Sequence, residues 1–332
     1  MEKVYIVTGG TGFVGNNLVK ELESRGENVV VLAQSREKAE KALVGSGAKI
    51  IFGSIMNVSD LEALFEIHSS AQYIFIHTAS VVYLGRNKQR LANMYETNIQ
   101  GTQNVVDVCI RHGARLVYVS SVHAIPETPK RGVIVEVNNF NPKKVVGNYA
   151  KSKAEASQMV LDAVRERELD AVLVHPSGIV GPNDYSDTHL TQMVEDYQNG
   201  RIPASVKGGY DFVDVRDVMQ GTLAVAERGV RGEGYLLTGE YSTVRNMLDT
   251  LCELGAGRRV RMRMPLWVAK VGLPFLTMYF KVRKRRPLYS RYSLYTLGSN
   301  SNFSNAKAKE QLGYTTRPLK ESLQDMVRGT NE

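Results

Sequence analysis

Short apolar runs alternate with segments of helical periodicity along the first 176 residues of the chain. Runs rich in β-branched and aromatic residues predict buried strands, and apolar residues at helical spacing predict amphipathic helices. The predicted strands are VYIVT (4–8), NVVVLA (28–33), KIIF (49–52), YIFIH (73–77), RLVYVS (115–120) and DAVLVHP (170–176). Helices are expected between them, the first from Phe13 to Arg25 and the second from Arg36. This alternation predicts an α/β fold with a doubly wound parallel sheet buried on both faces.

The alternation loosens after Pro176, where the turn-rich stretch HPSGIVGPND leads into a second lobe. DFVDVRDVMQGTLAVAERG (211–229) predicts a return to the edge of the core sheet and then a helix, and GYLLTG (234–239) predicts another strand. From Ser242 onward the pattern is mainly helical. We therefore predict a core of 1–176 plus about 211–238, and a smaller, mainly helical C-terminal lobe of about 177–210 plus 239–332.

A glycine-rich loop, TGGTGFVG (8–15), joins the first strand to the first helix. Gly9 permits a sharp turn, Gly12 lets the backbone approach a pyrophosphate, and Gly15 lets the helix pack closely on the strand. The N–H groups at the start of the helix then face the phosphates. The loop predicts a dinucleotide-binding core of the Rossmann type.

The end of the second strand indicates which dinucleotide binds. A carboxylate there bonds the ribose 2′-hydroxyl in NAD sites, and this strand instead leads into Ser35 and Arg36. Because the arginine fork suits a phosphate, NADP(H) is favoured over NAD(H). The alternative interpretation is that Arg36 only starts a solvated helix.

Tyr149 and Lys153 are four residues apart on a predicted helix, so both project from one face. A nearby ammonium is expected to lower the pKa of the phenol, which can then exchange a proton with a carbonyl or alcohol oxygen. Ser121 follows the fifth strand at the carboxyl edge of the sheet, where its hydroxyl can bond the reacting carbonyl. The structural alternatives are a shared helix face for the pair and a turn or cap for the serine.

With these motifs the sequence resembles the extended short-chain dehydrogenase/reductase family of the NAD-dependent epimerase/dehydratase superfamily. The matching stretches are TGGTGFVG, IHTAS, TNIQGTQN, VSS, YAKSK, HPSGIVGPND and SNFSNAKAKEQLGY. Within the family the chain is most similar to the NADPH branch of dihydroflavonol reductases and 3β-hydroxysteroid-dehydrogenase-like proteins. The resemblance implies a substrate-binding C-terminal lobe.

The resemblance also implies roles for individual residues. It implies a catalytic set of Ser121, Tyr149 and Lys153, with Asn98 stabilising the active-site helix and a proton-relay water. The cofactor-binding residues that it implies are Gly9, Thr11, Gly12, Phe13, Val14, Gly15, Ser35, Arg36, Ser54, Ile55, Thr78, Ala79, Ser80, Tyr149, Lys153, Pro176, Gly178 and Ile179. The helices around Gly101–His112 and Ala150–Arg165 resemble the pair that forms a four-helix bundle in this family, which predicts a homodimer.

The net charge of the chain is +8, and part of the excess is the run KVRKRR at 281–286. It follows the apolar run PLWVAKVGLPFLTMYF, which a lysine, two prolines and a glycine make a poor membrane span. We interpret 265–286 as a helix that covers a pocket or packs on the core; the alternatives are contact with a membrane surface and a lid for an apolar ligand. Trp267 and the tyrosines of 279–295 predict either an aromatic pocket or lobe core. The basic residues are not interleaved with a stacking platform, so we expect no nucleic-acid partner.

The histidines, the cysteines and the charged residues of VDVRDV add no further catalytic motif. The histidines show no metal-ligand spacing, and the two cysteines, Cys109 and Cys252, are far apart, so we predict no metal site. His123 and His175 either line the pocket or are structural. In VDVRDV we expect Asp217 to cap the following helix and Arg216 to pair with a carboxylate. The cysteine usage and the lack of a basic-then-apolar leader after Met1 predict a cytoplasmic protein.

These observations predict an NADP(H)-dependent oxidoreductase. It transfers a hydride between nicotinamide and the carbonyl or secondary alcohol of a small, fairly apolar molecule. One alternative is a nucleotide-sugar epimerase or dehydratase that retains NAD, and a second is a non-enzymatic NADP-binding sensor.

Overall fold

A computed structural model of the chain describes residues 2–66, 71–186, 188–282 and 289–329. Within these ranges, the side chains of Lys130, of 275–277 and of 279–282 are not described. His68 and most of the basic run at 281–286 lie outside the described residues.

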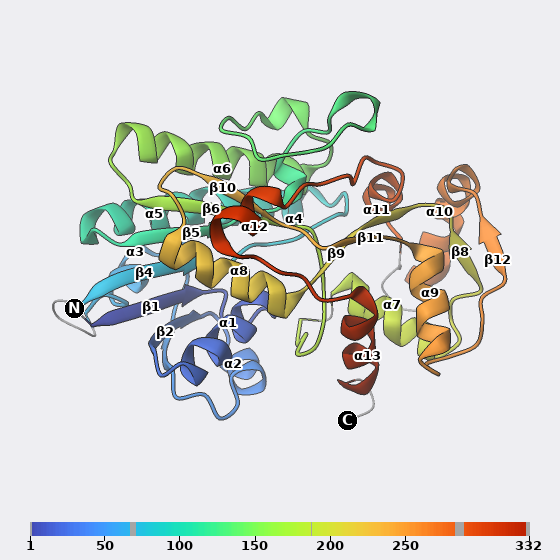
Figure 1. Cartoon of the computed structure of the whole chain (residues 1–332), viewed down its shortest axis with the longest axis horizontal. Coiled ribbons are helices and arrows are strands. Elements are labelled where there is room, and N and C mark those ends of the chain that lie inside the picture. Colours follow the sequence, from blue (N-terminus) through green and yellow to red (C-terminus); the bar gives the residue numbers. More distant parts are fainter. Residues whose placement is uncertain (1, 67–70, 187, 283–288, 330–332) are drawn as a thin grey trace.

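Seven parallel strands form the central sheet, in the order β10-β6-β5-β4-β1-β2-β3 (Figure 1). The strands are β1 (Lys3–Thr8), β2 (Asn28–Ala33), β3 (Lys49–Phe52), β4 (Gln72–His77), β5 (Arg115–Val119), β6 (Ala171–Pro176) and β10 (Gly234–Leu237). The strand order reverses direction between β1 and β4, and in such sheets ligands bind at the carboxyl ends of the strands beside that point. The predicted doubly wound parallel sheet is confirmed.

Helices cover both faces of this sheet. In β1 the buried residues alternate: Val4 and Ile6 belong to one core cluster, and Tyr5 and Val7 belong to the other. One cluster packs under α3 (Val58–Glu62), α5 (Gly101–His112) and α6 (Asn148–Glu166), with α4 (Lys88–Tyr95) beside α6. The other packs under α1 (Phe13–Ser24), α2 (Arg36–Ala42), α8 (Val215–Arg228) and α12 (Ala306–Leu312). Burial on both faces explains why these strands are continuous apolar runs.

Short helical turns complete this part of the chain. One π-helical turn, Glu96–Gln100, joins α4 to α5, and such turns are frequent at functional sites. Three 3₁₀ turns follow β5, at Val122–Ala124, Pro129–Arg131 and Pro142–Lys144.

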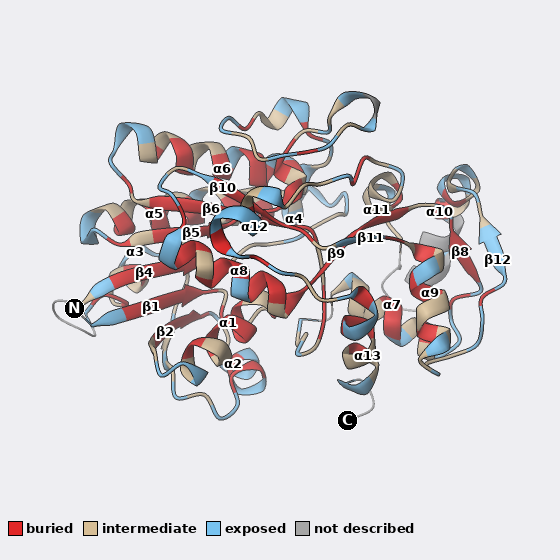
Figure 2. Cartoon of the chain, viewed as in Figure 1, coloured by how far each residue is buried: buried red, intermediate tan, exposed pale blue. Residues whose placement is uncertain are grey.

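The second lobe combines two small sheets with helices (Figure 2). The larger sheet has the order β11-β9-β7 and the smaller one pairs β12 with β8. The strands are β7 (Gly178–Val180), β8 (Ala204–Val206), β9 (Gly209–Asp214), β11 (Glu240–Thr243) and β12 (Met262–Met264). The helices are α7 (His189–Gln198), α9 (Val244–Glu253), α10 (Leu266–Val282), α11 (Arg291–Thr296) and α13 (Leu319–Gly329).

The prediction that the chain returns to the core sheet at Asp211 is wrong. That segment is β9, which lies between β7 and β11 in the second lobe, and β10 fills the core edge beside β6 instead. Every residue of β9 is buried, so its pattern identifies a central strand but not the sheet to which it belongs. The domain limits remain a prediction.

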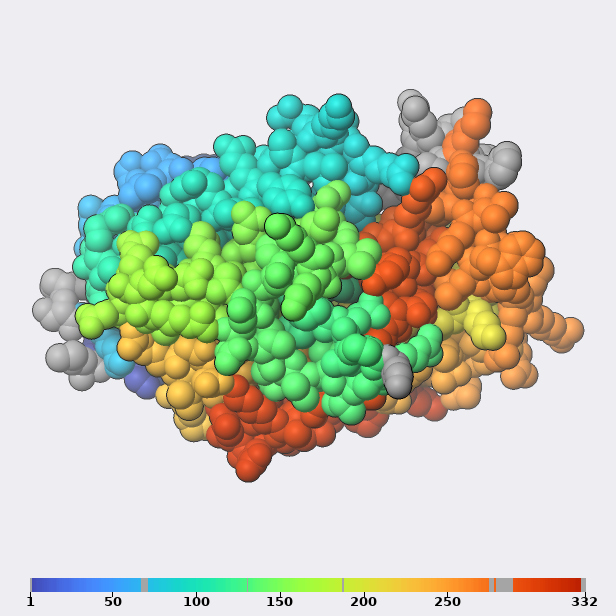
Figure 3. Space-filling model, turned by 90° about the horizontal axis from the view of Figure 1, so that it is seen from above, coloured from blue at the N-terminus to red at the C-terminus, as the bar shows by residue number. Residues whose placement is uncertain are grey.

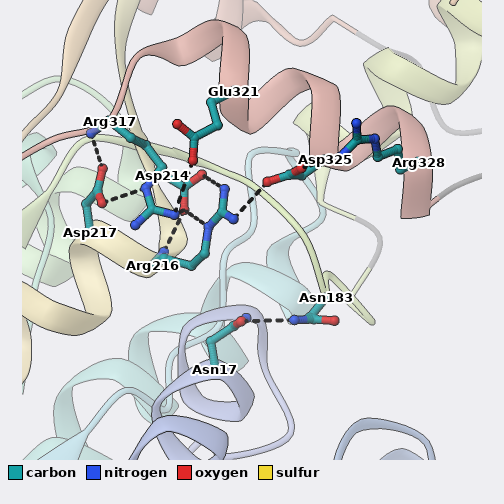
Figure 4. Close-up of polar contacts among 9 residues, drawn as sticks. All are labelled: Asn17, Asn183, Asp214, Arg216, Asp217, Arg317, Glu321, Asp325 and Arg328. Atoms are coloured by element: carbon teal, nitrogen blue, oxygen red, sulfur yellow. Dashed lines mark hydrogen bonds and ion pairs between the residues drawn. The ribbon is translucent and has the colours of Figure 1, made fainter.

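A network of ion pairs joins the C-terminal segment to the start of α8 (Figure 4). Asp214 caps α8, accepting a hydrogen bond from the Arg216 backbone N–H at 2.8 Å and pairing with the Arg216 guanidinium at 2.8 Å. Arg216 also reaches Asp325 of α13 at 2.7 Å, so its predicted pairing with a carboxylate is confirmed. The predicted cap at Asp217 is wrong, because that carboxylate binds the guanidinium and backbone N–H of Arg317, both at 2.8 Å.

Replacing Arg317 by alanine is expected to lower the free energy of unfolding by about 2–3 kcal/mol, because it leaves a nearly buried carboxylate without its cation, although the backbone N–H at 317 still bonds it. The side chain of Asp217 is 6% exposed, whereas Arg317 itself is 25% exposed, which moderates the loss. Urea unfolding measures the effect. Arg328→Ala is the matched control, since that side chain is 69% exposed and its pair is worth little. Equal losses in the two variants would show that the network does not stabilise the fold.

The helix α10 is apolar on more than one face. Ala269 and Leu273 are buried against Val206 and Leu294, whereas Trp267 is 67% exposed. Within the described part of the chain, no helix is long and apolar enough to cross a bilayer.

Candidate active site

The loop after β1 has room only for glycine at two positions. Gly9 has a φ of +72°, and a Cβ there would lie 2.6 Å from Thr78 Oγ1. A Cβ on Gly15 would lie 2.1 Å from the carbonyl oxygen of Gly9. Gly12 is the N-cap of α1, and no side chain caps that helix, so its first N–H groups are available to an anion. The cradle that these glycines leave fits the pyrophosphate of a dinucleotide.

The other predicted residues of this loop lie in or just before the first turn of α1. Phe13 is buried in the first turn of α1, and Thr11 and Val14 are half-buried on either side of it.

Ser35 and Arg36 form the start of α2, at the carboxyl end of β2. The Ser35 hydroxyl caps the helix by accepting a hydrogen bond from the Lys38 backbone N–H at 3.3 Å. The Arg36 guanidinium lies over the Phe52 ring, 4.4 Å from its centroid. Arg36 therefore does begin a helix, and its cation also stays beside the end of the second strand.

Ser54 and Ile55 follow β3 on the same edge of the sheet. The Ser54 backbone N–H donates to Asp60 at 2.8 Å, and its hydroxyl accepts from the Gln34 side chain at 3.3 Å, which ties this turn to the end of β2. Ile55 is buried against Gly101 at the start of α5, and its carbonyl accepts a hydrogen bond from the Asn104 side chain of that helix at 2.9 Å.

Asn98 connects the loop after β4 to α6. Its side-chain oxygen accepts from the Val81 backbone N–H at 2.8 Å and from the Ser80 hydroxyl at 3.2 Å. Its side-chain nitrogen donates to the Val81 carbonyl at 3.0 Å and to the Ser152 hydroxyl of α6 at 3.1 Å. The start of the same loop is held by Thr78, whose hydroxyl donates to the Thr8 carbonyl at 2.7 Å, and Ala79 lies between these anchors. These contacts fix the loop relative to the helix that carries Tyr149.

Tyr149 and Ser121 lie together at the carboxyl edge of the sheet. The phenol of Tyr149 lies close enough to the side chains of Ser121 and Ser80 for both to lower its pKa. Ser121 is 7% exposed and also caps a 3₁₀ turn through the His123 backbone N–H. The structure thus brings the predicted acid beside the predicted carbonyl-binding hydroxyl.

Lys153 faces the sheet and not the phenol. Its Nζ donates to the Val119 carbonyl at 2.8 Å and to the Tyr118 hydroxyl at 3.3 Å, and burial lowers its pKa to about 7. Burial raises the pKa of Tyr149 to about 12, although the neighbouring side chains of Ser121 and Ser80 act in the opposite direction. The predicted lowering of the phenol pKa by the lysine is therefore not found in this structure. At neutral pH Tyr149 is a protonated phenol.

Pro176, Gly178 and Ile179 lie where the chain leaves the core. Pro176 ends β6, and the other two belong to β7 of the second lobe. A Cβ on Gly178 would lie about 3 Å from the Phe212 ring and the Asp211 carbonyl, so this strand packs closely on β9. The segment therefore places the beginning of the second lobe beside the sheet edge.

A pocket of about 250 Å³ opens between the two lobes beside Tyr149. In Figure 3 the segment around 120–146 (green) lies against the C-terminal lobe (orange to red). The His123 ring stacks on Tyr210, 5.5 Å between centroids, and meets the Tyr149 ring edge-on at 6.3 Å. The apolar lining residues are Val122, Ile125, Ile134, Val145, Val146, Tyr210, Tyr292, Tyr295 and Phe303.

The polar lining of the pocket is centred on Glu127. Its carboxylate accepts hydrogen bonds from the Tyr295 hydroxyl and, at 3.0 Å, from the Asn300 backbone N–H. Burial lowers the pKa of His123 to about 4, so this ring is neutral at pH 7. The wall nearest Tyr149 is therefore aromatic and uncharged.

Sequence reasoning identified only part of this lining. His123 was one of two open interpretations and does line the pocket, whereas His175 is buried and reaches the Ser121 carbonyl at 3.3 Å. Tyr292 and Tyr295 lay in the aromatic stretch predicted as pocket or lobe core; Trp267 does not line the pocket. Tyr210, Glu127 and Asn300 were missed, and no local motif marks them. Among the described residues no group of three or more histidines, cysteines or acids is placed to hold a metal ion.

Comparisons with known proteins agree with this geometry. The model of the NAD dependent epimerase/dehydratase family matches residues 5–237. Sterol demethylase protein B of Methylococcus capsulatus is 29% identical over 97% of this chain and 96% of its own length. A 4-hydroxy-2-methyl-3-oxo-4-farnesyl-3,4-dihydroquinoline-1-oxide ketoreductase of Stigmatella aurantiaca is 29% identical over 97% of this chain and 95% of its own length.

A solved structure shows the same fold. The dTDP-glucose 4,6-dehydratase DesIV of Streptomyces venezuelae, crystallised with NAD, superposes with a TM-score of 0.77 at 20% identity, over 99% of this chain and 97% of that one. Related proteins of this fold thus bind a nicotinamide dinucleotide. Given the family match, the glycine cradle and the Ser121–Tyr149 pair, the chain belongs to the NAD-dependent epimerase/dehydratase family of extended short-chain dehydrogenases/reductases, NAD(P)-dependent enzymes that act on CH–OH and C=O groups.

Proposed function

We propose that the protein is an NADP(H)-dependent reductase of a small, fairly apolar carbonyl compound, or the corresponding alcohol dehydrogenase. The observation that carries this proposal is the Tyr149 phenol, which lies beside Ser121 and next to a pocket whose nearest wall is formed by aromatic rings. A protonated phenol can give its proton to a carbonyl oxygen, and the Ser121 hydroxyl can donate a hydrogen bond to the same oxygen. Both groups suit the direction of reduction.

The dinucleotide would be held along the carboxyl edge of the sheet. The N–H groups at the start of α1 would bind its pyrophosphate, and the turn at Ser54 would lie near its adenine end. Lys153 would hold the ribose hydroxyls next to the nicotinamide, and the strand at Gly178 and Ile179 would support the ring. When bound, the nicotinamide supplies or accepts the hydride.

The NADP preference rests on the end of β2. Arg36 and the Ser35 hydroxyl occupy the position where a carboxylate would bind the ribose of NAD. The guanidinium has no acidic partner among the described residues and lies against the Phe52 ring, which leaves its N–H donors free for a 2′-phosphate.

The character of the pocket supports a reductase over a nucleotide-sugar epimerase. A sugar nucleotide carries a second pyrophosphate, and Lys144 is the one cation among the described residues that line the pocket. Two of the related proteins are named for sterol and farnesyl-quinoline chemistry, in which the substrates have apolar bodies. A non-enzymatic NADP-binding sensor would not need a proton donor such as Tyr149 beside the pocket.

A panel of apolar ketones and aldehydes, assayed by loss of NADPH absorbance, tests the proposal. We expect turnover of at least one ring ketone with NADPH and a much lower kcat/KM with NADH. Arg36→Ala is expected to reduce the ratio of the kcat/KM with NADPH to the kcat/KM with NADH. If no ketone is reduced while sugar nucleotides bind and NAD copurifies, the epimerase alternative is correct. The homodimer and the cytoplasmic location remain predictions; light scattering at working concentration tests the first.

A further inference from the structure

The outer face of α10 is apolar and exposed. Trp267, Val271 and Met278 are 67%, 66% and 71% exposed, and Pro274 between them is also exposed. Their spacing of four, three and four residues places them on one stripe of the helix. Met262 of β12, which lies at the same end of the molecule, is 55% exposed (Figure 1).

The opposite side of the same helix is already buried. Ala269 and Leu273, at 5% and 6% exposure, pack with Val206 of β8 and Leu294 of α11. A helix that is apolar on both sides is expected to be covered on both sides. The exposed stripe is therefore a contiguous apolar surface of the kind that marks an interaction site.

Exposed basic side chains lie close to this stripe in the sequence. Five exposed cations lie either on α10 or in the segment that leads through β12 into it. They are Arg258, Arg259, Arg261, Arg263 and Lys270. Arg259 approaches Asp249 at 3.7 Å, and the other four make no ion pair with an acid of the described residues. The surface thus combines apolar side chains with uncompensated positive charge.

We propose that this surface, which we call the α10 surface and define as Trp267, Val271, Met278 and the five cations, binds the face of an anionic lipid bilayer. Arginine and lysine side chains can extend to lipid phosphates while the apolar stripe enters the boundary of the acyl chains, where tryptophan is favoured. The helix would lie on the bilayer, since no described helix is able to span one.

The charges argue against a second copy of the chain as the occupant. A symmetric dimer through this surface would place the same five cations opposite one another, and like charges in an interface are unfavourable. An anionic lipid surface neutralises them instead. The helix α11, which carries Tyr292 and Tyr295 of the pocket wall, packs directly behind α10. A bilayer bound at the α10 surface would therefore lie close to the pocket.

The single tryptophan of the chain, Trp267, is a direct reporter for the test. We expect its emission to shift to shorter wavelength when the full-length protein meets vesicles of phosphatidylcholine with a minority of phosphatidylglycerol. Vesicles of phosphatidylcholine alone should give little shift, and added salt should reverse the binding. No shift with the anionic vesicles overturns the proposal, and so does equal binding to both kinds. A shift that depends on protein concentration without vesicles would identify a second copy as the occupant and also overturn it.

Two pairs of variants separate the apolar and charged parts, with co-sedimentation as the second readout. Val271→Asp is expected to abolish the shift, whereas Val230→Asp, at another exposed valine, in the loop before β10, should leave it unchanged. Arg261→Gln with Arg263→Gln is expected to weaken binding roughly fivefold per charge, and Arg328→Gln on α13 should have no effect. Unchanged binding in the double variant contradicts the proposal. None of these measurements uses a nucleotide or a carbonyl substrate, so their outcome is independent of the proposed function.

Discussion

Tyr149→Phe is expected to lower kcat for carbonyl reduction by about 10²- to 10⁴-fold while the KM for NADPH changes little. The phenol lies beside the Ser121 side chain, and the substitution removes its hydroxyl while keeping the ring that packs against His123. Burial raises the pKa of this phenol to about 12, so it stays protonated through neutral pH and is available to the carbonyl oxygen. Steady-state rates with a ketone that the carbonyl panel shows to be reduced measure the effect.

The matched control for this substitution is Tyr241→Phe, which removes a hydroxyl from a tyrosine that is 55% exposed on β11. Its kcat should equal that of the unmodified protein. If Tyr149→Phe retains the full rate, another group delivers the proton and the proposed mechanism is wrong. If both variants lose activity to the same extent, the loss reflects the fold and not the chemistry.

The second large effect is expected from Gly15→Ala, which should weaken NADPH binding roughly 10- to 100-fold. The added Cβ would lie 2.1 Å from the Gly9 carbonyl oxygen and 2.7 Å from its carbonyl carbon. Both are backbone atoms of the phosphate loop, so α1 and the loop must move apart, and the cradle for the pyrophosphate is lost. Isothermal titration calorimetry with NADPH measures the change directly.

Gly329→Ala is the control, because a Cβ at that position on α13 meets no atom within 4 Å. Its affinity for NADPH should be unchanged. Thermal unfolding of both variants without nucleotide shows whether Gly15→Ala has damaged the core. Tight NADPH binding by Gly15→Ala would mean that the dinucleotide does not use this loop.

The sequence by itself determined the core of the protein. Strand and helix periodicity are local properties, so VYIVT, NVVVLA and the other apolar runs identified the buried strands, and the alternation identified a parallel sheet. The glycine loop is equally local, because the turn at Gly9 and the close approach at Gly15 involve neighbours in the chain. Motifs that follow strands lie at one edge of a parallel sheet, which placed Ser121 there, whereas its meeting with Tyr149 was implied by the family resemblance.

The tertiary structure alone decided features that depend on partners far away in the chain. Whether β9 joins the core sheet or the second lobe depends on which strands it pairs with, and its buried pattern is compatible with either. The pocket joins His123, Tyr210 and Tyr292, which no spacing relates. Lys153 was expected to tune the phenol, and it bonds the Val119 carbonyl because packing set its direction. Motifs made of adjacent residues can be identified from the sequence. Sheet partners and pocket walls depend on contacts between distant residues, and pKa values depend on burial, so only the folded chain defines them.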